Sequence, residues 1–331
     1  MTAEEPVRVA IEESGAGALV LPSLFEEQVV AWNARLGREQ STRQSGTYEP
    51  TPVTADPAYG NAEVYLAMVN RASIEHSIPV IASLNGQTTG SWIEIAGELQ
   101  EVGAAAIELS LYHPPAEAYS SPREMEDQLV EAAKRLKASI TVPLFLKLDH
   151  AYTSLPHLCS RLLSGADGLV LFGRRPDTNI CLDSLATESR WALTQAGSCE
   201  QSLGAIMRAH TYCPAMPLAA SGGISSPEDL AKVLLAGADV GMVTSAIYRG
   251  GAGVVASLLD GLRQWMSDQQ ISSMIELYQK RPLQFASDTE RSKYIAALSS
   301  RPRMTFSGDD ATGRPQLQGD RFGHPIGEQS N

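Results

Sequence analysis

The sequence predicts an α/β fold of the TIM (β/α)8 barrel type, with the first strand missing from this chain. Three observations lead to this prediction. The 331 residues fit one barrel with appendages, because α/β barrels commonly reach about 250 residues or more as one domain. Strand-sized apolar runs alternate with amphipathic helical stretches, and four helix-to-strand junctions share a Gly-Ala step.

The four junctions place a glycine where a helix ends and a strand follows. Gly15, Gly103, Gly165 and Gly237 each precede an alanine and then an apolar run. We expect each glycine to end its helix in a left-handed conformation. Helices and strands that alternate in this way favour a parallel sheet buried on both faces.

Seven strands and nine helices are predicted from these patterns. Pro122 and Pro227 each follow a serine, which is typical of a helix's first turn. The strands are expected to begin at Ala18, Val80, Ala105, Val142, Gly168, Leu218 and Val240. The helices are expected around 4–14, 24–36, 61–76, 92–102, 122–137, 155–163, 202–210, 227–235 and 254–266. Since the chain opens on a helix, the absent member of the eight strands is the first.

The predicted domain boundary lies near residue 285. Residues 1–285 form the barrel domain, incomplete at its N-terminus, and 286–331 form a C-terminal extension that is largely disordered, with a polar tail from about Arg301. Two inserts, 38–60 and 174–199, are expected to be long loops at the carboxyl ends of strands, where barrel enzymes build their substrate sites.

Composition excludes several classes of partner. The net charge of −12 and the absence of a dense Lys/Arg block disfavour nucleic acid and anionic membrane surfaces. No apolar run approaches the length of a membrane span, and the acidic start of the chain is unlike a signal peptide, so we expect a cytoplasmic protein. The four cysteines show no paired spacing and are expected to be free thiols.

The clearest chemical signal follows the last two predicted strands. Ser221, Gly222 and Gly223 end one strand and open a helix, while Thr244 and Ser245 end the next. Adjacent glycines let backbone N–H groups approach an anion, and a helix N-terminus adds partial positive charge. We therefore expect a phosphate site here. The alternative is a glycine-rich turn that only lets helix and strand pack.

Three further side chains are candidates for chemistry. Lys147 ends a strand, where a cation in the barrel mouth would need a flavin edge, a substrate carboxylate or a salt bridge to Glu108. His113 follows another strand and is either a general base or a surface-loop histidine. The same choice applies to His150. No helix carries ligands at metal-binding spacing, so no metal site is expected.

Several motifs, in order, resemble the dihydroorotate dehydrogenase family, and within it a bacterial dihydroorotate dehydrogenase-like subgroup. They are Ile78–Gly86, Glu101–Ser110, Val142–Leu148, Gly165–Phe172 and Ser221–Ile224. The resemblance spans about residues 5–280. It implies a barrel that holds FMN across its mouth.

The resemblance also implies roles for individual residues. Lys147 would contact the flavin and assist catalysis, with His113 as the base. The phosphate would be held by Gly222 and Gly223 with Ser221, Thr244 and Ser245. Ser110 and Gly173 would complete the cofactor site, although both stand where the family has asparagine. Because asparagines that would bond a dihydropyrimidine ring are largely absent, dihydroorotate itself is not expected to be the substrate.

The function predicted from the resemblance is an FMN-dependent oxidoreductase that acts on a small molecule and passes electrons to an unidentified acceptor. A homodimer is compatible with it. Two alternatives stay open: a catalytically silent barrel that binds a phosphate or flavin, and an aldolase-type barrel that uses Lys147 as a Schiff base. The missing strand predicts either a coding sequence that begins upstream of Met1 or a decayed form that binds flavin poorly.

Overall fold

The fold is taken from a computed structural model, which describes residues 1–35, 61–86, 92–111, 121–148, 152–174, 176–282 and 287–299. The chain divides into two compact units, Met1–Leu283 and Gln284–Asn331. In the second unit, within the extension predicted to be largely disordered, the structure describes helix α12 (Ser287–Ser299). The predicted tail from Arg301 lies outside the described residues.

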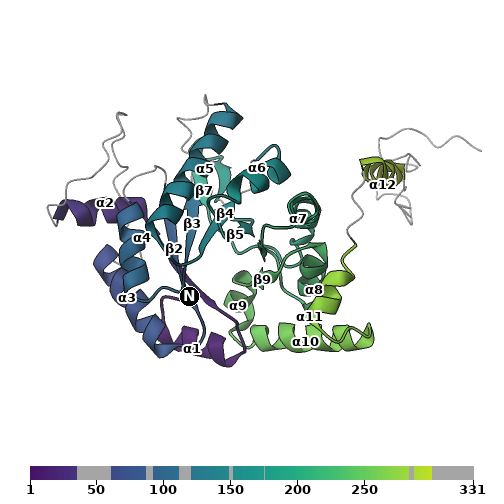
Figure 1. Cartoon of the computed structure of the whole chain (residues 1–331), viewed down its shortest axis with the longest axis horizontal. Helices are drawn as coiled ribbons and strands as arrows, with labels where there is room; N and C mark the ends of the chain where they lie inside the picture. The colour runs from purple at the N-terminus through teal and green to yellow at the C-terminus, as the bar shows by residue number, and fades with distance from the viewer. Residues whose placement is uncertain are drawn as a thin grey trace, which may run out of the picture. The chain divides into compact units, whose positions relative to one another are not determined.

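The first unit is built on a curled, wholly parallel sheet (Figure 1). Each of its strands begins within two residues of its predicted start. In the described residues no strand joins the edges β1 and β9, so the barrel is open where the first strand was predicted to be missing. In spatial order the strands are β1 (Leu19–Phe25), β2 (Val80–Gly86), β3 (Ala106–Leu111), β4 (Leu144–Leu148), β5 (Gly168–Leu171), β8 (Leu218–Ser221) and β9 (Val240–Met242).

Helices surround the outside of this sheet (Figure 1). The nine predicted helices are all present, together with two short ones, α9 and α11, that were not predicted. In chain order they are α1 (Glu5–Glu13), α2 (Glu26–Arg35), α3 (Ala62–Glu75), α4 (Trp92–Glu101), α5 (Pro122–Ser139), α6 (Leu155–Leu162), α7 (Glu200–Tyr212), α8 (Pro227–Ala236), α9 (Ser245–Gly250), α10 (Val254–Asp268) and α11 (Met274–Gln279).

Three local predictions need correction. The second helix begins at Glu26 and not at Leu24, because β1 continues past Pro22 after a register irregularity that tolerates the missing N–H. The insert 174–199 is not simply a loop, since it contains the antiparallel hairpin β6 (Asp177–Cys181) and β7 (Ala186–Arg190). Gly165 is not left-handed like the other three junction glycines. A Cβ there would instead lie 2.9 Å from the Lys134 nitrogen on α5.

A row of six leucines across six neighbouring strands organises the core. The strands pair so that these side chains share one row, and each is at most 2% exposed. Burying a leucine contributes about 1.5–3 kcal/mol. The row therefore favours this strand register and determines which face of each strand packs against the surrounding helices. Its members are Leu24, Leu84, Leu109, Leu146, Leu169 and Leu218.

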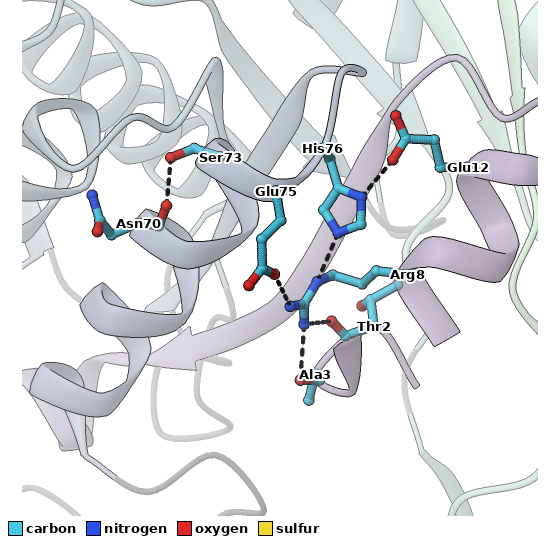
Figure 2. Close-up of polar contacts among 8 residues, drawn as sticks. All are labelled: Thr2, Ala3, Arg8, Glu12, Asn70, Ser73, Glu75 and His76. Carbon is cyan, nitrogen blue, oxygen red and sulfur yellow. Dashed lines mark hydrogen bonds and ion pairs between the residues drawn. The ribbon is translucent and has the colours of Figure 1, made fainter. Parts of the chain in front are cut away.

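A buried arginine fastens the N-terminal segment to the end of α3 (Figure 2). The Arg8 side chain is 2% exposed. Its Nη1 donates to the carbonyls of Thr2 and Ala3 at 3.2 and 3.0 Å, and its Nε donates to His76 Nε2 at 3.2 Å. Glu75 supplies a carboxylate 3.4 Å from Nη2. The guanidinium therefore exchanges water for four fixed acceptors.

His76 continues this network to the end of α1. Because its Nε2 accepts from Arg8, its Nδ1 carries the proton and donates to Glu12 Oε2 at 2.5 Å (Figure 2). Glu12 also accepts from the hydroxyl and backbone N–H of Ser77. Hydrogen bonds from Ser77, followed by that from His76, lower the pKa of Glu12 to about 2. The ionised carboxylate thus joins α1 to the turn that enters β2.

Candidate functional site

Polar side chains gather on the inner face of the strands, opposite the row of leucines. Ser23, Ser83 and Glu108 are paired in register on β1, β2 and β3. The Ser23 and Ser83 hydroxyls lie 2.8 Å apart, and Ser83 donates to Glu108 Oε1 at 2.9 Å. Lys147 on β4 completes the chain, with Nζ 3.0 Å from the same oxygen. Hydrogen bonds thus cross four neighbouring strands.

The ion pair between Lys147 and Glu108 is the salt bridge that the sequence allowed as one partner for the lysine. Glu108 is 2% exposed, whereas Lys147 is 24% exposed at the carboxyl end of β4. The carboxylate is therefore buried beneath a cation that still reaches the open end of the sheet. This placement leaves the lysine able to contact a molecule bound above the strands.

Ser110 and Gly173 lie on either side of Lys147. Ser110 on β3 is its direct register partner. A Cβ added to Gly173, just after β5, would come within 3.2 Å of Lys147 Cγ. Glycine therefore gives the lysine stem room to extend along the strand ends. Asn85 on β2 pairs with Ser110 in the same row, and sequence reasoning did not single it out because only the strand register reveals this neighbour.

The turn after β8 has the left-handed backbone that two glycines allow, with φ of 99° at Gly222 and 76° at Gly223. A Cβ on Gly223 would lie 2.3 Å from the Cys199 nitrogen. Gly223 is thus required by close packing of the chain. A Cβ on Gly222 would meet only Thr194 Cγ2, at 4.0 Å, so space for a ligand remains beside Gly222.

A segment at the end of the insert, residues 194–199, joins the two predicted halves of the phosphate site. Gly197 donates its N–H to the Gly223 carbonyl at 2.9 Å. Thr194 donates its N–H to Ser245 Oγ at 3.0 Å, and Ser245 follows Thr244 at the start of α9. The structure therefore brings the turn after β8 and the residues after β9 together. The hydroxyl of Ser245 is already an acceptor for protein.

Asp229 stabilises the turn from within α8. Its Oδ2 accepts from the backbone and hydroxyl of Ser225 and from the backbone of Ser226, at 2.9–3.1 Å. Burial alone would raise the pKa of Asp229, but these hydrogen bonds outweigh it and the pKa is lowered. An ionised carboxylate therefore holds the start of α8 directly after the glycine turn, as part of a capping box.

His113 and His150 lie outside the described residues, as does the insert 38–60. The four cysteines are free thiols, as predicted, and three of them are buried. Across the ranges that the structure describes, no helix combines the length and apolar character needed to cross a bilayer.

Known proteins similar to this chain are dihydroorotate and dihydropyrimidine dehydrogenases. No protein-family model matches. A protein of Aeropyrum pernix named dihydroorotate dehydrogenase A (fumarate) is 27% identical over 263 residues, which cover 77% of this chain and 82% of the relative. The catalytic subunit of dihydroorotate dehydrogenase B (NAD(+)) from Shouchella clausii is 27% identical, over 61% of this chain and 68% of the relative.

Two further similarities concern a different activity and the fold. The PreA subunit of the NAD-dependent dihydropyrimidine dehydrogenase of Escherichia coli is 28% identical over 65% of this chain and 56% of its own length. A solved DHODH of Eimeria tenella in complex with ferulenol superposes with a TM-score of 0.53 and 16% identity, covering 67% of this chain and 68% of the other. At that identity the structure supports the fold alone. In its sequence and in its curled parallel sheet, this chain is similar to dihydroorotate dehydrogenases.

Proposed function

We propose that this protein is an FMN-dependent oxidoreductase that oxidises or reduces a carbon–carbon bond of a small molecule. One observation carries the proposal: Lys147, Ser110 and the turn at Gly222 lie at the same carboxyl edge of the sheet. This is the edge where α/β barrels bind their ligands. The similarity to dihydroorotate dehydrogenases supports FMN as the ligand.

The residues at this edge fit the two ends of an FMN molecule. The backbone of Gly222 and Gly223, after Ser221, would hold the phosphate together with Thr244 and Ser245, because left-handed glycines expose their N–H groups to an anion. The open space beside Gly222 is consistent with such an anion. Bound FMN would supply a two-electron acceptor for a hydride.

Lys147, with Ser110 and Gly173 beside it, would face the other end of the cofactor. Its ammonium group can stabilise negative charge that develops on a reduced flavin, while Glu108 keeps it oriented. His113 would act as the base that removes a substrate proton. The substrate is proposed to be a small cyclic molecule other than dihydroorotate, since Ser110 and Gly173 lack the amide groups of asparagine.

A visible spectrum of the purified protein is the first test. Bound flavin should give its characteristic absorbance, and heat-released cofactor should be identified as FMN by mass spectrometry. Lys147→Ala should keep part of the flavin but slow its anaerobic reduction by a substrate, whereas Lys134→Ala on the exposed face of α5 should change neither property. Protein that remains colourless after incubation with excess FMN would refute the proposal.

The aldolase alternative predicts a different covalent outcome. A Schiff base needs a free amine, but Lys147 Nζ is already paired with Glu108 Oε1 at 3.0 Å. The oxidoreductase is therefore preferred. Borohydride treatment in the presence of a carbonyl substrate would trap an adduct on Lys147 only if the aldolase hypothesis is correct.

We further propose that the enzyme acts in the cytoplasm as a homodimer and passes electrons to a separate acceptor. The net charge of −12 supports a partner other than nucleic acid or an anionic membrane. Size-exclusion chromatography with light scattering would measure the mass of the assembly. A monomer at all accessible concentrations would contradict the dimer and leave the flavin proposal intact.

A further inference from the structure

The strand pairing forms a row of side chains at the carboxyl ends of the strands, one layer beyond the buried chain of hydrogen bonds. Its members, in register on β1 to β4, are Phe25, Asn85, Ser110 and Lys147. Because side chains alternate along a strand, each of the first three shares the inner face with the polar residue two positions before it. The row therefore lies on the inner face, at the edge where the proposed cofactor would bind.

The row is polar in its middle and apolar on both sides. Phe25 stands at one side, and Val170 on β5, the register partner of Lys147, stands at the other. Between them, three neighbouring strands carry an amide, a hydroxyl and an ammonium group. Since neighbouring strands lie about 4.8 Å apart, the outer Cα atoms of this polar strip are about 10 Å apart. Such a strip suits a ring system that carries its polar groups along one edge.

The amide of Asn85 is available to a ligand. Its side chain is half-buried, and no hydrogen bond joins it to another residue in the described part of the chain. Lys147, by contrast, already pairs with Glu108 at 3.0 Å. An asparagine side chain has two N–H donors and a carbonyl acceptor. Leaving such groups unpaired in a partly buried position is unfavourable, so a ligand that pairs with them gains binding energy.

The backbone on both sides of Asn85 is held in place. Two residues earlier, Ser83 donates its N–H to the Tyr65 hydroxyl at 3.0 Å, and its carbonyl accepts from that hydroxyl at 3.2 Å. Directly after Asn85, a Cβ on Gly86 would lie 2.8 Å from Cδ1 of Trp92, which is 1% exposed. The end of β2 is therefore a rigid support, and binding groups act best from rigid elements.

Phe25, the neighbour of Asn85 in the row, is a second indication of a ligand. Its side chain is 39% exposed although it lies on the inner face of the sheet, whereas the preceding Leu24, on the outer face, is 1% exposed. Ligand sites are commonly lined by aromatic side chains with a few placed polar groups. An exposed phenyl group beside an unpaired amide is the combination that a flat ring with a polar edge requires.

We propose that Asn85 binds the pyrimidine edge of the flavin ring, with its amide paired to the C4=O and N3–H groups. This inference rests on the proposed function, because it takes FMN as the ligand. The C4=O and N3–H groups are an acceptor beside a donor, and the asparagine amide offers the complementary donor and acceptor. Lys147, two strands away, is left for the N1–C2=O side of the same ring. A substrate carbonyl is the other candidate for this amide, and FMN binding measured without substrate separates the two.

Fluorescence titration of the full chain with FMN tests this contact. Asn85→Leu keeps the size of the side chain but removes the amide, so it should weaken FMN binding by about tenfold. Asn70→Leu is the matched control, because the Asn70 amide on α3 is bonded at 3.2 Å to the carbonyl of Val102, which precedes β3 at the opposite end of the strands. This variant should leave FMN affinity unchanged. Thermal unfolding of both variants checks that they fold.

N3-methyl-FMN, which lacks the N3–H donor, supplies a readout that a purely structural role would not change. The wild type should bind it about tenfold more weakly than FMN, and Asn85→Leu should bind the two equally. Equal FMN affinity in the wild type and Asn85→Leu, or the same preference for FMN over N3-methyl-FMN in both, would overturn this inference and leave the proposed function standing. A wild type that binds no FMN would overturn both.

Discussion

The pair between Lys147 and Glu108 makes a sharp prediction about stability. Lys147→Met keeps the length of the stem but removes the cation from a carboxylate that is 2% exposed. Breaking a buried ion pair in this way costs about 3–5 kcal/mol. Lys147 is itself 24% exposed, so water can partly replace it and we expect a loss of about 3 kcal/mol. Ser83 remains as a hydrogen-bond donor to the carboxylate.

Urea unfolding of the flavin-free protein at pH 7 measures this loss. Lys147→Met combined with Glu108→Gln removes both charges, so the double variant should recover most of the stability, with a coupling energy of about 2 kcal/mol. Lys134→Met, on the exposed surface of α5, serves as the control and should stay within about 0.5 kcal/mol of the wild type. A loss below about 1 kcal/mol for Lys147→Met, or a double variant no more stable than the single one, would refute the reasoning.

Three other variants test separate parts of the structure. Gly222→Val should lose FMN affinity, measured by fluorescence titration. Both Gly222→Val and Gly223→Val strain a left-handed backbone, but Gly223→Val should lower the melting temperature further because its Cβ also meets backbone atoms; equal melting temperatures would count against this distinction. Since the pKa of Glu12 is lowered from 4.5 to about 2, its contribution to stability is present above about pH 4.5 and lost as the pH falls toward 2. Glu12→Gln should therefore be less stable than the wild type at pH 7, and its free energy of unfolding should change less with pH between these values. Free energies of unfolding that change in parallel with pH in the two proteins would argue against this assignment. Tyr65→Phe leaves both backbone groups of Ser83 without the buried hydroxyl and should cost about 1–3 kcal/mol in urea unfolding, so an unchanged midpoint would contradict the assigned hydrogen bonds.

The sequence predicted the strands well because their signals are local. Apolar runs bounded by Gly-Ala or proline mark where a strand must start, and the serines before Pro122 and Pro227 do form capping boxes. The left-handed glycines at 15, 103 and 237 follow from the same local chemistry. Gly165 differs because glycine is needed there for close packing against α5, and no local sequence pattern reveals that contact.

Features that depend on contacts between distant residues were less predictable. Glu108 was one of several allowed partners for Lys147, and only the pairing of β3 with β4 selects it. The position of Asn85 beside Ser110 depends on strand register in the same way. The hairpin in the insert lacks an Asn-Gly turn and contains Asp and Asn in its strands, residues that disfavour sheets. Its existence is therefore hidden from propensity alone.

The segment 194–199 connects the hairpin of the insert to the proposed phosphate site. On one side it continues from the hairpin β6–β7, and on the other it is bonded to Gly223 and to Ser245. A ligand or partner that rigidifies the hairpin would therefore remove conformational freedom from the same backbone that borders the turn at Gly222. Thermodynamic linkage then makes the effect reciprocal: if binding at the hairpin tightens an anion's binding at this turn by some factor, the bound anion tightens binding at the hairpin by the same factor.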